Sequence, residues 1–246
     1  MKILALYSIK GGVGKTAAAV NLARLAAGDG APTLLWDMDP QGSTSYYCRI
    51  KPKLKGGGKK LIGGQCASGD LIKGTDHERL DLLPADFSLR HLDLLLDRGK
   101  KPVRQLRKVL KPLAAEYQYV FLDCPPNISL LSECVIEITD AILSPIIPTT
   151  LSLRTLDQLT GFIADHHQGG LDVLPFFSMV DRRKKLHREI LTTLPERCPG
   201  LLRTPIPYAS DIERMGIERA PVCDYAPRSR SARAYRMLWD EIKERI

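Results

Sequence analysis

Apolar runs alternate with stretches of helical spacing along the whole chain. Buried strands are predicted by runs that are apolar on both faces, at residues 2–9, 33–37, 80–84, 119–123, 141–147 and 173–180. Helices are predicted by apolar residues at helical spacing, over residues 15–27, 88–97, 103–117, 152–166, 185–194 and 231–246. Strands alternating with helices favour a mostly parallel, twisted sheet covered on both faces. We therefore expect one α/β domain spanning residues 1–246.

Residues 51–64 depart from this pattern. They contain five Lys and five Gly but few apolar residues, which predicts a mobile loop. The segment from Leu201 onward also stands apart, because it is rich in Pro and Arg before the last predicted helix.

The composition is that of a globular protein with a mild affinity for polyanions. Hydrophobic residues make up 44% of the 246 residues, and no apolar run reaches the roughly 18 residues of a membrane span. A formal net charge of +8 favours nucleic acid only slightly, because Lys and Arg are common on any surface. The scattered cysteines include no CxxC pair, so we expect free thiols in a reducing cytosol. They are Cys48, Cys66, Cys124, Cys134, Cys198 and Cys223.

A glycine-rich turn joins the first predicted strand to the first predicted helix. It reads Lys10-Gly11-Gly12-Val13-Gly14-Lys15-Thr16. Backbone N–H groups and a helix N-terminus in this arrangement bind phosphate, a Lys meets the β- and γ-phosphates, and a hydroxyl binds Mg²⁺. The strict G-x-x-x-x-G-K-[ST] pattern is not met, because Ile9 takes the place of its first Gly and an additional lysine, Lys10, follows.

This loop resembles the deviant Walker A motif of the ParA/MinD family of P-loop ATPases. Further matches to that family follow in order at residues 37–43 (DMDPQGS), 121–126 (FLDCPP), 178–183 (SMVDRR) and 220–230 (APVCDYAPRSR). The resemblance implies a Soj-like ATPase that uses ATP and Mg²⁺. It also implies a short ParA without an N-terminal helix-turn-helix, since the first strand is predicted to begin at residue 2.

The resemblance also implies roles for individual residues. Asp39 would position the attacking water near the metal, and Asp123, at the end of an apolar strand, would hold Mg²⁺ together with Thr16. Lys10 would reach across an ATP-dependent homodimer to the partner's nucleotide, whereas Lys15 would contact the phosphates in its own subunit. The predicted nucleotide contacts are Lys10, Gly11, Gly12, Val13, Gly14, Lys15, Thr16 and Ala17, with Met179, Pro207 and Ala209 near the adenine.

Members of this family differ in whether the ATP-bound dimer binds DNA or a membrane. We expect a nucleoid-associated cytoplasmic protein that binds DNA non-specifically, with a ParB-like or other cargo adaptor stimulating hydrolysis. Tyr208 stands where the family often has an arginine, so neighbouring residues would have to supply the DNA contact. The candidates are Arg203, Arg214, Arg219, Arg228 and Arg230, with the basic stretches 51–60 and 98–111 as further possibilities.

Three alternatives remain open. A MinD-like membrane switch would need a free amphipathic helix at residues 231–246, but its acidic residues favour packing onto the sheet and no stable membrane association. A redox iron protein would need a cluster cysteine where Pro126 stands. An amidotransferase-type synthetase shares the loop, but no second catalytic module is visible in the sequence.

Overall fold

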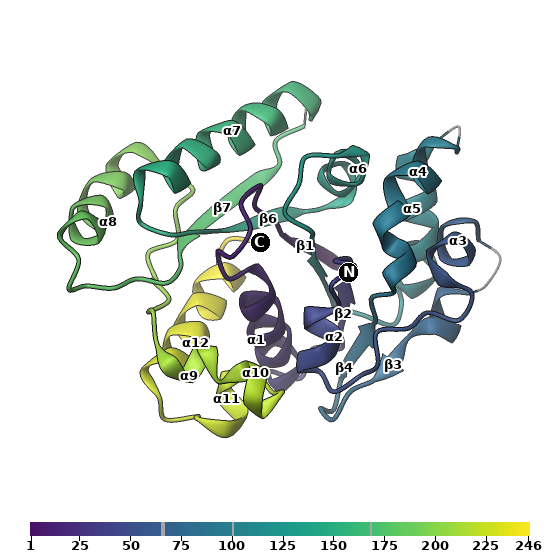
Figure 1. The fold of residues 1–246 in the computed structure, drawn as a ribbon, viewed down its shortest axis with the longest axis horizontal. Helices are drawn as coiled ribbons and strands as arrows, with labels where there is room; N and C mark the ends of the chain where they lie inside the picture. Colours follow the sequence, from purple (N-terminus) through teal and green to yellow (C-terminus); the bar gives the residue numbers. More distant parts are fainter. Residues whose placement is uncertain (65–66, 100, 168) are drawn as a thin grey trace.

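The computed structural model describes residues 1–64, 67–99, 101–167 and 169–246, so Cys66 lies outside the described residues. Its centre is a seven-stranded sheet in the order β3-β4-β2-β5-β1-β6-β7 (Figure 1). All neighbouring strands are parallel except β3 and β4. The strands are β1 (Lys2–Leu6), β2 (Thr33–Asp37), β3 (Lys73–Gly74), β4 (Leu80–Leu83), β5 (Tyr119–Asp123), β6 (Ala141–Ile146) and β7 (Asp172–Phe177). The expected α/β fold is confirmed.

Helices cover both faces of the sheet, and strand residues alternate between the two cores. Leu4 and Leu6 of β1 face one core, whereas Ala5 lies in the other. The first core lies under α1 (Lys15–Gly28), α9 (Ser210–Glu213), α10 (Met215–Glu218), α11 (Val222–Tyr225) and α12 (Arg230–Lys243). The second lies under α4 (Leu92–Asp97), α5 (Pro102–Leu110), α6 (Leu130–Ile138) and α7 (Thr150–His166), and α8 (Lys185–Arg197) packs near β7.

The C-terminal helix α12 packs into the core, as its sequence predicts. Trp239 is fully buried, and its ring lies 5.2 Å from Tyr119 and 5.8 Å from Phe121 between centroids. Asp29, after α1, accepts hydrogen bonds from Trp239, Arg236 and Lys243 of α12. Of the helices in the described ranges, none has the length and hydropathy to traverse a bilayer.

The prediction of a mobile loop at residues 51–64 is wrong. The segment contains α3 (Gly57–Ile62), and Leu54, Leu61 and Ile62 are buried in the core. The Leu54 N–H donates to Asp86 Oδ2 at 3.0 Å. The few apolar residues among the glycines therefore decide the conformation, because they are the ones that reach the core.

Two predicted helices are shorter in the structure than the sequence pattern suggested. The helix expected over residues 103–117 ends as α5 at Leu110, and a 3₁₀ turn, η3 (Lys111–Leu113), follows because Pro112 has no N–H to continue it. The helix expected over residues 88–97 begins with a 3₁₀ turn, η2 (Phe87–His91). Elements that the sequence did not predict are α2 (Ser43–Tyr47), α3, α6, α9, α10, α11, β3 and η1 (Ser68–Leu71).

Candidate nucleotide site

The glycine-rich loop lies between β1 and α1, at the edge of the sheet where the parallel strands end. Gly12 and Gly14 adopt φ angles of 70° and 94°, a backbone conformation that residues with a side chain rarely adopt. A Cβ on Gly14 would also lie 2.8 Å from Ser178 Oγ. The loop therefore requires glycine at these two positions. It also points the N-terminus of α1 at the space beyond the end of β1, where a phosphate would bind.

The two lysines of the loop are in different surroundings. Lys15 is 7% exposed, and its ammonium donates to the Lys10 carbonyl oxygen at 3.2 Å. Burial lowers the Lys15 pKa, and the negative charge of Asp123 partly offsets this effect. Lys10 is only partly buried, and its ammonium forms no ion pair within the described ranges. Lys15 is thus held at the site, whereas the Lys10 cation remains available.

Two buried carboxylates end the adjacent strands β2 and β5, at the paired positions Asp37 and Asp123. Asp123 Oδ2 accepts a hydrogen bond from Thr44 Oγ1 at 2.7 Å, and the Thr16 side chain lies close enough to lower the pKa of this carboxyl group. Asp37 Oδ2 accepts from the Ser45 N–H at 2.8 Å and from Ser45 Oγ at 2.7 Å. In the described part of the chain, both Oδ1 atoms are buried without a hydrogen-bond partner.

Burial raises the pKa of both carboxyl groups. The pKa of Asp123 rises to about 6, although the hydrogen bond from Thr44, the nearby Thr16 side chain and the charge of Lys15 oppose the change. The pKa of Asp37 rises to about 7, because burial is reinforced by the charge of Asp123. A buried carboxylate oxygen without a partner, beside a threonine hydroxyl, fits a hard cation such as Mg²⁺. The residues present thus fit the predicted metal.

Asp39 lies next to this pair. It is partly buried, and its Oδ1 accepts from the Gln41 N–H at 2.9 Å. It is near enough that its negative charge contributes to the raised pKa of Asp37 and of Asp123. The structure thus brings Lys15, Asp39 and Asp123 together at one edge, as the sequence predicts for a catalytic group.

A hollow beside the loop collects the residues expected near the adenine. Met179, Pro207 and Ala209 line it together with Gly14 and Ala17. The segment after Ile206 reaches this position because Pro207 pairs with Val180 beyond the end of β7. Sequence reasoning missed Glu213 and Tyr235 in this wall, since they lie on helices whose local pattern carries no nucleotide signal.

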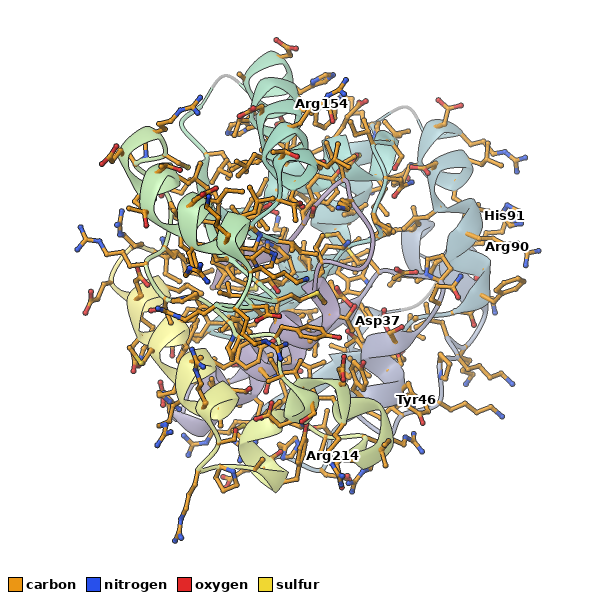
Figure 2. All side chains as sticks on the ribbon, turned by 60° about the vertical axis from the view of Figure 1, so that its left-hand side comes forward. Asp37, Tyr46, Arg90, His91, Arg154 and Arg214 are labelled. Carbon is orange, nitrogen blue, oxygen red and sulfur yellow. The ribbon has the colours of Figure 1, made fainter. Side chains whose placement is uncertain are left out.

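The helix α2 is the part of the site that the sequence did not reveal. Thr44 and Ser45 are fully buried and hold the two carboxylates. Asp37 is buried, whereas Tyr46 and Arg214 are exposed; Figure 2 labels Asp37 near the middle of the view and the other two below it. The family match at residues 37–43 (DMDPQGS) marked the segment just before these residues. It did not assign a contact to the hydroxyl of Thr44 or of Ser45.

Arg203 lies apart from Arg230 among the predicted DNA-binding arginines. The Arg203 N–H bonds to Glu241, eleven positions after Arg230 on α12, which is roughly 17 Å along a helix. Arg214 pairs with Glu218 at 2.5 Å. The guanidinium of Arg219 lies 4.5 Å from the Tyr46 ring centroid and donates to the Tyr46 carbonyl oxygen. Arg228 is exposed. Arg214 and Arg219 are therefore already engaged by neighbours.

This chain is similar in sequence to known proteins over most of its length. The model of the AAA domain family matches residues 1–171. The chromosome partitioning protein ParA of Caulobacter vibrioides is 30% identical over 198 residues, which cover 77% of this chain and 74% of that protein. The chain belongs to the ParA family of P-loop NTPases. The sporulation initiation inhibitor protein Soj of Bacillus subtilis is 29% identical and aligns over 98% of both chains.

Among solved structures, cobyrinic acid a,c-diamide synthase from Mycobacterium smegmatis superposes on this ParA-family chain with a TM-score of 0.83. The two are 25% identical, and the match covers 99% of this chain and 95% of the other. That structure holds an ATP analogue and magnesium. The ParA resemblance and the fold expected from the sequence are both confirmed.

Proposed function

We propose that this chain is an ATP-dependent partition or positioning ATPase that hydrolyses ATP to ADP and phosphate. The observation that carries the proposal is the loop with Lys15 at its end and the buried Asp123 carboxylate facing it. ATP drives two copies into a sandwich dimer that binds DNA without sequence preference. A ParB-like or other cargo adaptor stimulates hydrolysis and releases the dimer, which moves or positions a plasmid, chromosome or protein cargo near the nucleoid.

The site's own residues divide the work of hydrolysis. Thr16 and Asp123 would hold Mg²⁺, which neutralises charge on the phosphates when it is bound. Lys15 binds the β- and γ-phosphates, and the loop N–H groups orient them. Asp39 positions the attacking water. The hollow lined by Met179, Pro207 and Ala209 takes the adenine.

Lys10 completes the site from the partner subunit. Its partly buried ammonium has no carboxylate partner in the described ranges, so it is available for an anion outside its own subunit. A cation delivered across an interface stabilises the charge that develops on the transferred phosphate, as an arginine finger does. The same contact explains why ATP would hold the dimer together.

The MinD-like alternative is disfavoured by α12. A membrane-binding helix needs a free apolar face, but Tyr235, Leu238, Trp239 and Ile242 are at most 2% exposed in the core. The similarity to the chromosome partitioning protein ParA of Caulobacter vibrioides favours partition over a membrane role. A liposome sedimentation assay with ATP would detect a membrane role directly.

The test is retention of the protein on plasmid DNA at low salt with ATP, ADP or no nucleotide. We expect retention with ATP only, together with a dimer by light scattering. Lys15→Gln should abolish nucleotide binding and, with it, both signals. Equal retention with ATP and ADP would refute the proposal, as would a monomer at high concentration with a non-hydrolysable ATP analogue bound.

A further inference from the structure

A basic groove runs beside α2, on the surface formed by residues 49–55 and β3. Two adjoining hollows of about 540 and 590 Å³ share Ile50 and Lys51 in their walls. We call the first hollow the lysine groove, because it is lined by Lys51, Lys53, Lys55 and Lys73. Lys73 belongs to β3, which pairs with β4, and it lines the same hollow as lysines some twenty residues earlier in the chain.

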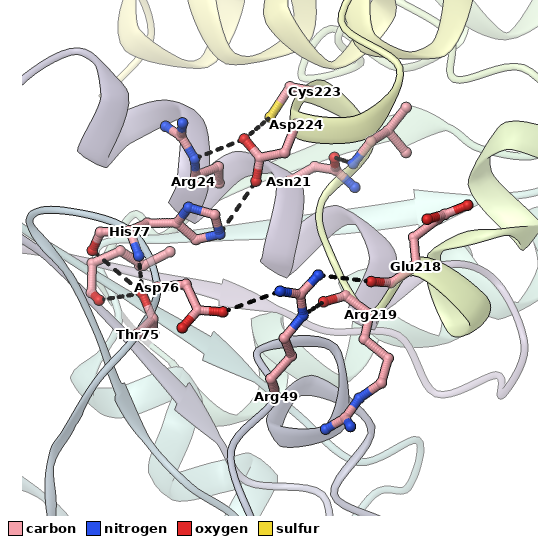
Figure 3. A network of polar contacts seen from close by, with 12 residues as sticks. Asn21, Arg24, Arg49, Thr75, Asp76, His77, Glu218, Arg219, Cys223 and Asp224 are labelled. Carbon is pink, nitrogen blue, oxygen red and sulfur yellow. Dashed lines mark hydrogen bonds and ion pairs between the residues drawn. The ribbon is translucent and has the colours of Figure 1, made fainter.

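The arginines around this groove hold the structure together. Arg49 donates to the carbonyl oxygens of Glu218 and Arg219 and pairs with Asp76 at 3.4 Å (Figure 3). Arg219 in turn packs on Tyr46. These contacts join α2 to α10, so both guanidiniums are already engaged by protein groups.

The four lysines differ from the arginines in this respect. All four are exposed, and within the described ranges none forms an ion pair. Asp70 is the acidic residue found in the lining, so the groove carries a positive excess. Positive side chains without protein partners concentrate a field that attracts polyanions.

The backbone beneath the lysines is fixed. Leu54, between Lys53 and Lys55, is 3% exposed, and its N–H bonds to Asp86. Gly42 at φ 68° lies so close to Pro52 that a Cβ would come within 2.8 Å of the proline ring. The lysines therefore extend from a fixed surface, which limits the entropy that binding would cost.

Helix α2 connects this surface to the nucleotide site. Its Thr44 and Ser45 bind the carboxylates of Asp123 and Asp37, whereas Tyr46 and the residues after it form the wall of the second hollow. A change at the carboxylates on nucleotide binding would therefore act on the helix from which the groove starts.

We propose that the lysine groove is the surface on which this chain holds the phosphate backbone of duplex DNA. The inference rests on the proposed function, since it places the DNA contact of the same ATPase. Lysine ammoniums bind phosphates as point charges and read no sequence, which suits non-specific binding. The groove takes over the contact expected from Arg214 and Arg219, because these two arginines are engaged within the protein.

The test compares two variants that each lose four positive charges. The groove variant carries Lys51→Gln, Lys53→Gln, Lys55→Gln and Lys73→Gln. The control variant carries Lys2→Gln, Lys184→Gln, Arg197→Gln and Arg245→Gln, at exposed positions outside the groove and outside the other basic stretches considered for DNA. Affinity for duplex DNA with ATP is measured at several salt concentrations, with nucleotide binding and the unfolding transition as checks on folding.

We expect the groove variant to bind DNA about tenfold or more weakly and the control variant to change by about threefold at most. The slope of log affinity against log salt should become shallower by about 2 to 4 in the groove variant, since each lost phosphate contact removes about 0.9. A groove variant that binds DNA as tightly as the control, with an unchanged slope, would overturn the inference and leave the proposed function standing. Unsubstituted protein that shows no ATP-dependent DNA binding would overturn both.

Discussion

Thr44→Val removes one hydrogen bond from a buried carboxylate and preserves the shape of the side chain. The hydroxyl donates to Asp123 Oδ2 at 2.7 Å, and both residues are at most 1% exposed. A hydrogen bond to a charged group contributes about 1.5–3 kcal/mol to stability. We therefore expect the free energy of unfolding of the nucleotide-free, metal-free protein to fall by about 2 kcal/mol at about pH 8.

The loss should depend on pH, and the sign follows from the raised pKa of Asp123. Because the folded pKa is about 6 rather than 3.8, its contribution to stability is fully present below about pH 4 and is lost as pH rises through 6. Removing the Thr44 donor raises this pKa further. The difference between variant and unsubstituted protein should thus be larger at about pH 8 than at about pH 5, by roughly 1 kcal/mol.

Urea unfolding followed by circular dichroism at the two pH values measures both differences. Thr155→Val is the matched control, because within the described residues its hydroxyl bonds to the Leu151 carbonyl oxygen of α7 alone. The control should change stability by no more than about 0.5 kcal/mol. If Thr44→Val unfolds at the same urea concentration as the unsubstituted protein at the higher pH, Thr44 does not stabilise an ionised Asp123 and the reasoning fails.

Three further predictions concern the same edge of the sheet. Asp39→Ala should lower the ATP hydrolysis rate about a hundredfold while the dimer still forms, because only the water loses its orientation; hydrolysis at the native rate would reject the role. Lys10→Ala should leave nucleotide affinity largely intact but prevent the ATP-dependent dimer, as light scattering would show; loss of nucleotide binding would instead make Lys10 a contact within its own subunit. Asp37→Asn should stabilise the nucleotide-free protein by roughly 2–4 kcal/mol at about pH 8 and by much less at about pH 5. The reason is that the pKa of Asp37 is raised to about 7 in the folded protein, so the ionised carboxylate present above that pH opposes folding. Urea unfolding measures the change, with the exposed Asp157→Asn as control, and equal stabilisation at both pH values would contradict it.

The sequence determined the features that depend on local spacing. The order of strands and helices follows from apolar periodicity, and the phosphate loop follows from glycines and a lysine between a strand and a helix. The expected adenine residues, Met179, Pro207 and Ala209, also meet in one hollow beside that loop. The family resemblance was visible for the same reason, because its motifs are short and contiguous.

The tertiary structure decided what depends on pairing across the chain. Asp37 and Asp123 become neighbours only because β2 pairs with β5, and burial then raises the pKa of both. The position of Lys73 beside residues 51–55 depends on β3, which is too short to be read from periodicity. Protein partners decide which cations are available, and those of Arg49 and Arg219 lie about 170 residues away in the sequence. A list of basic residues therefore could not separate the arginines that hold α2 from the lysines left facing solvent.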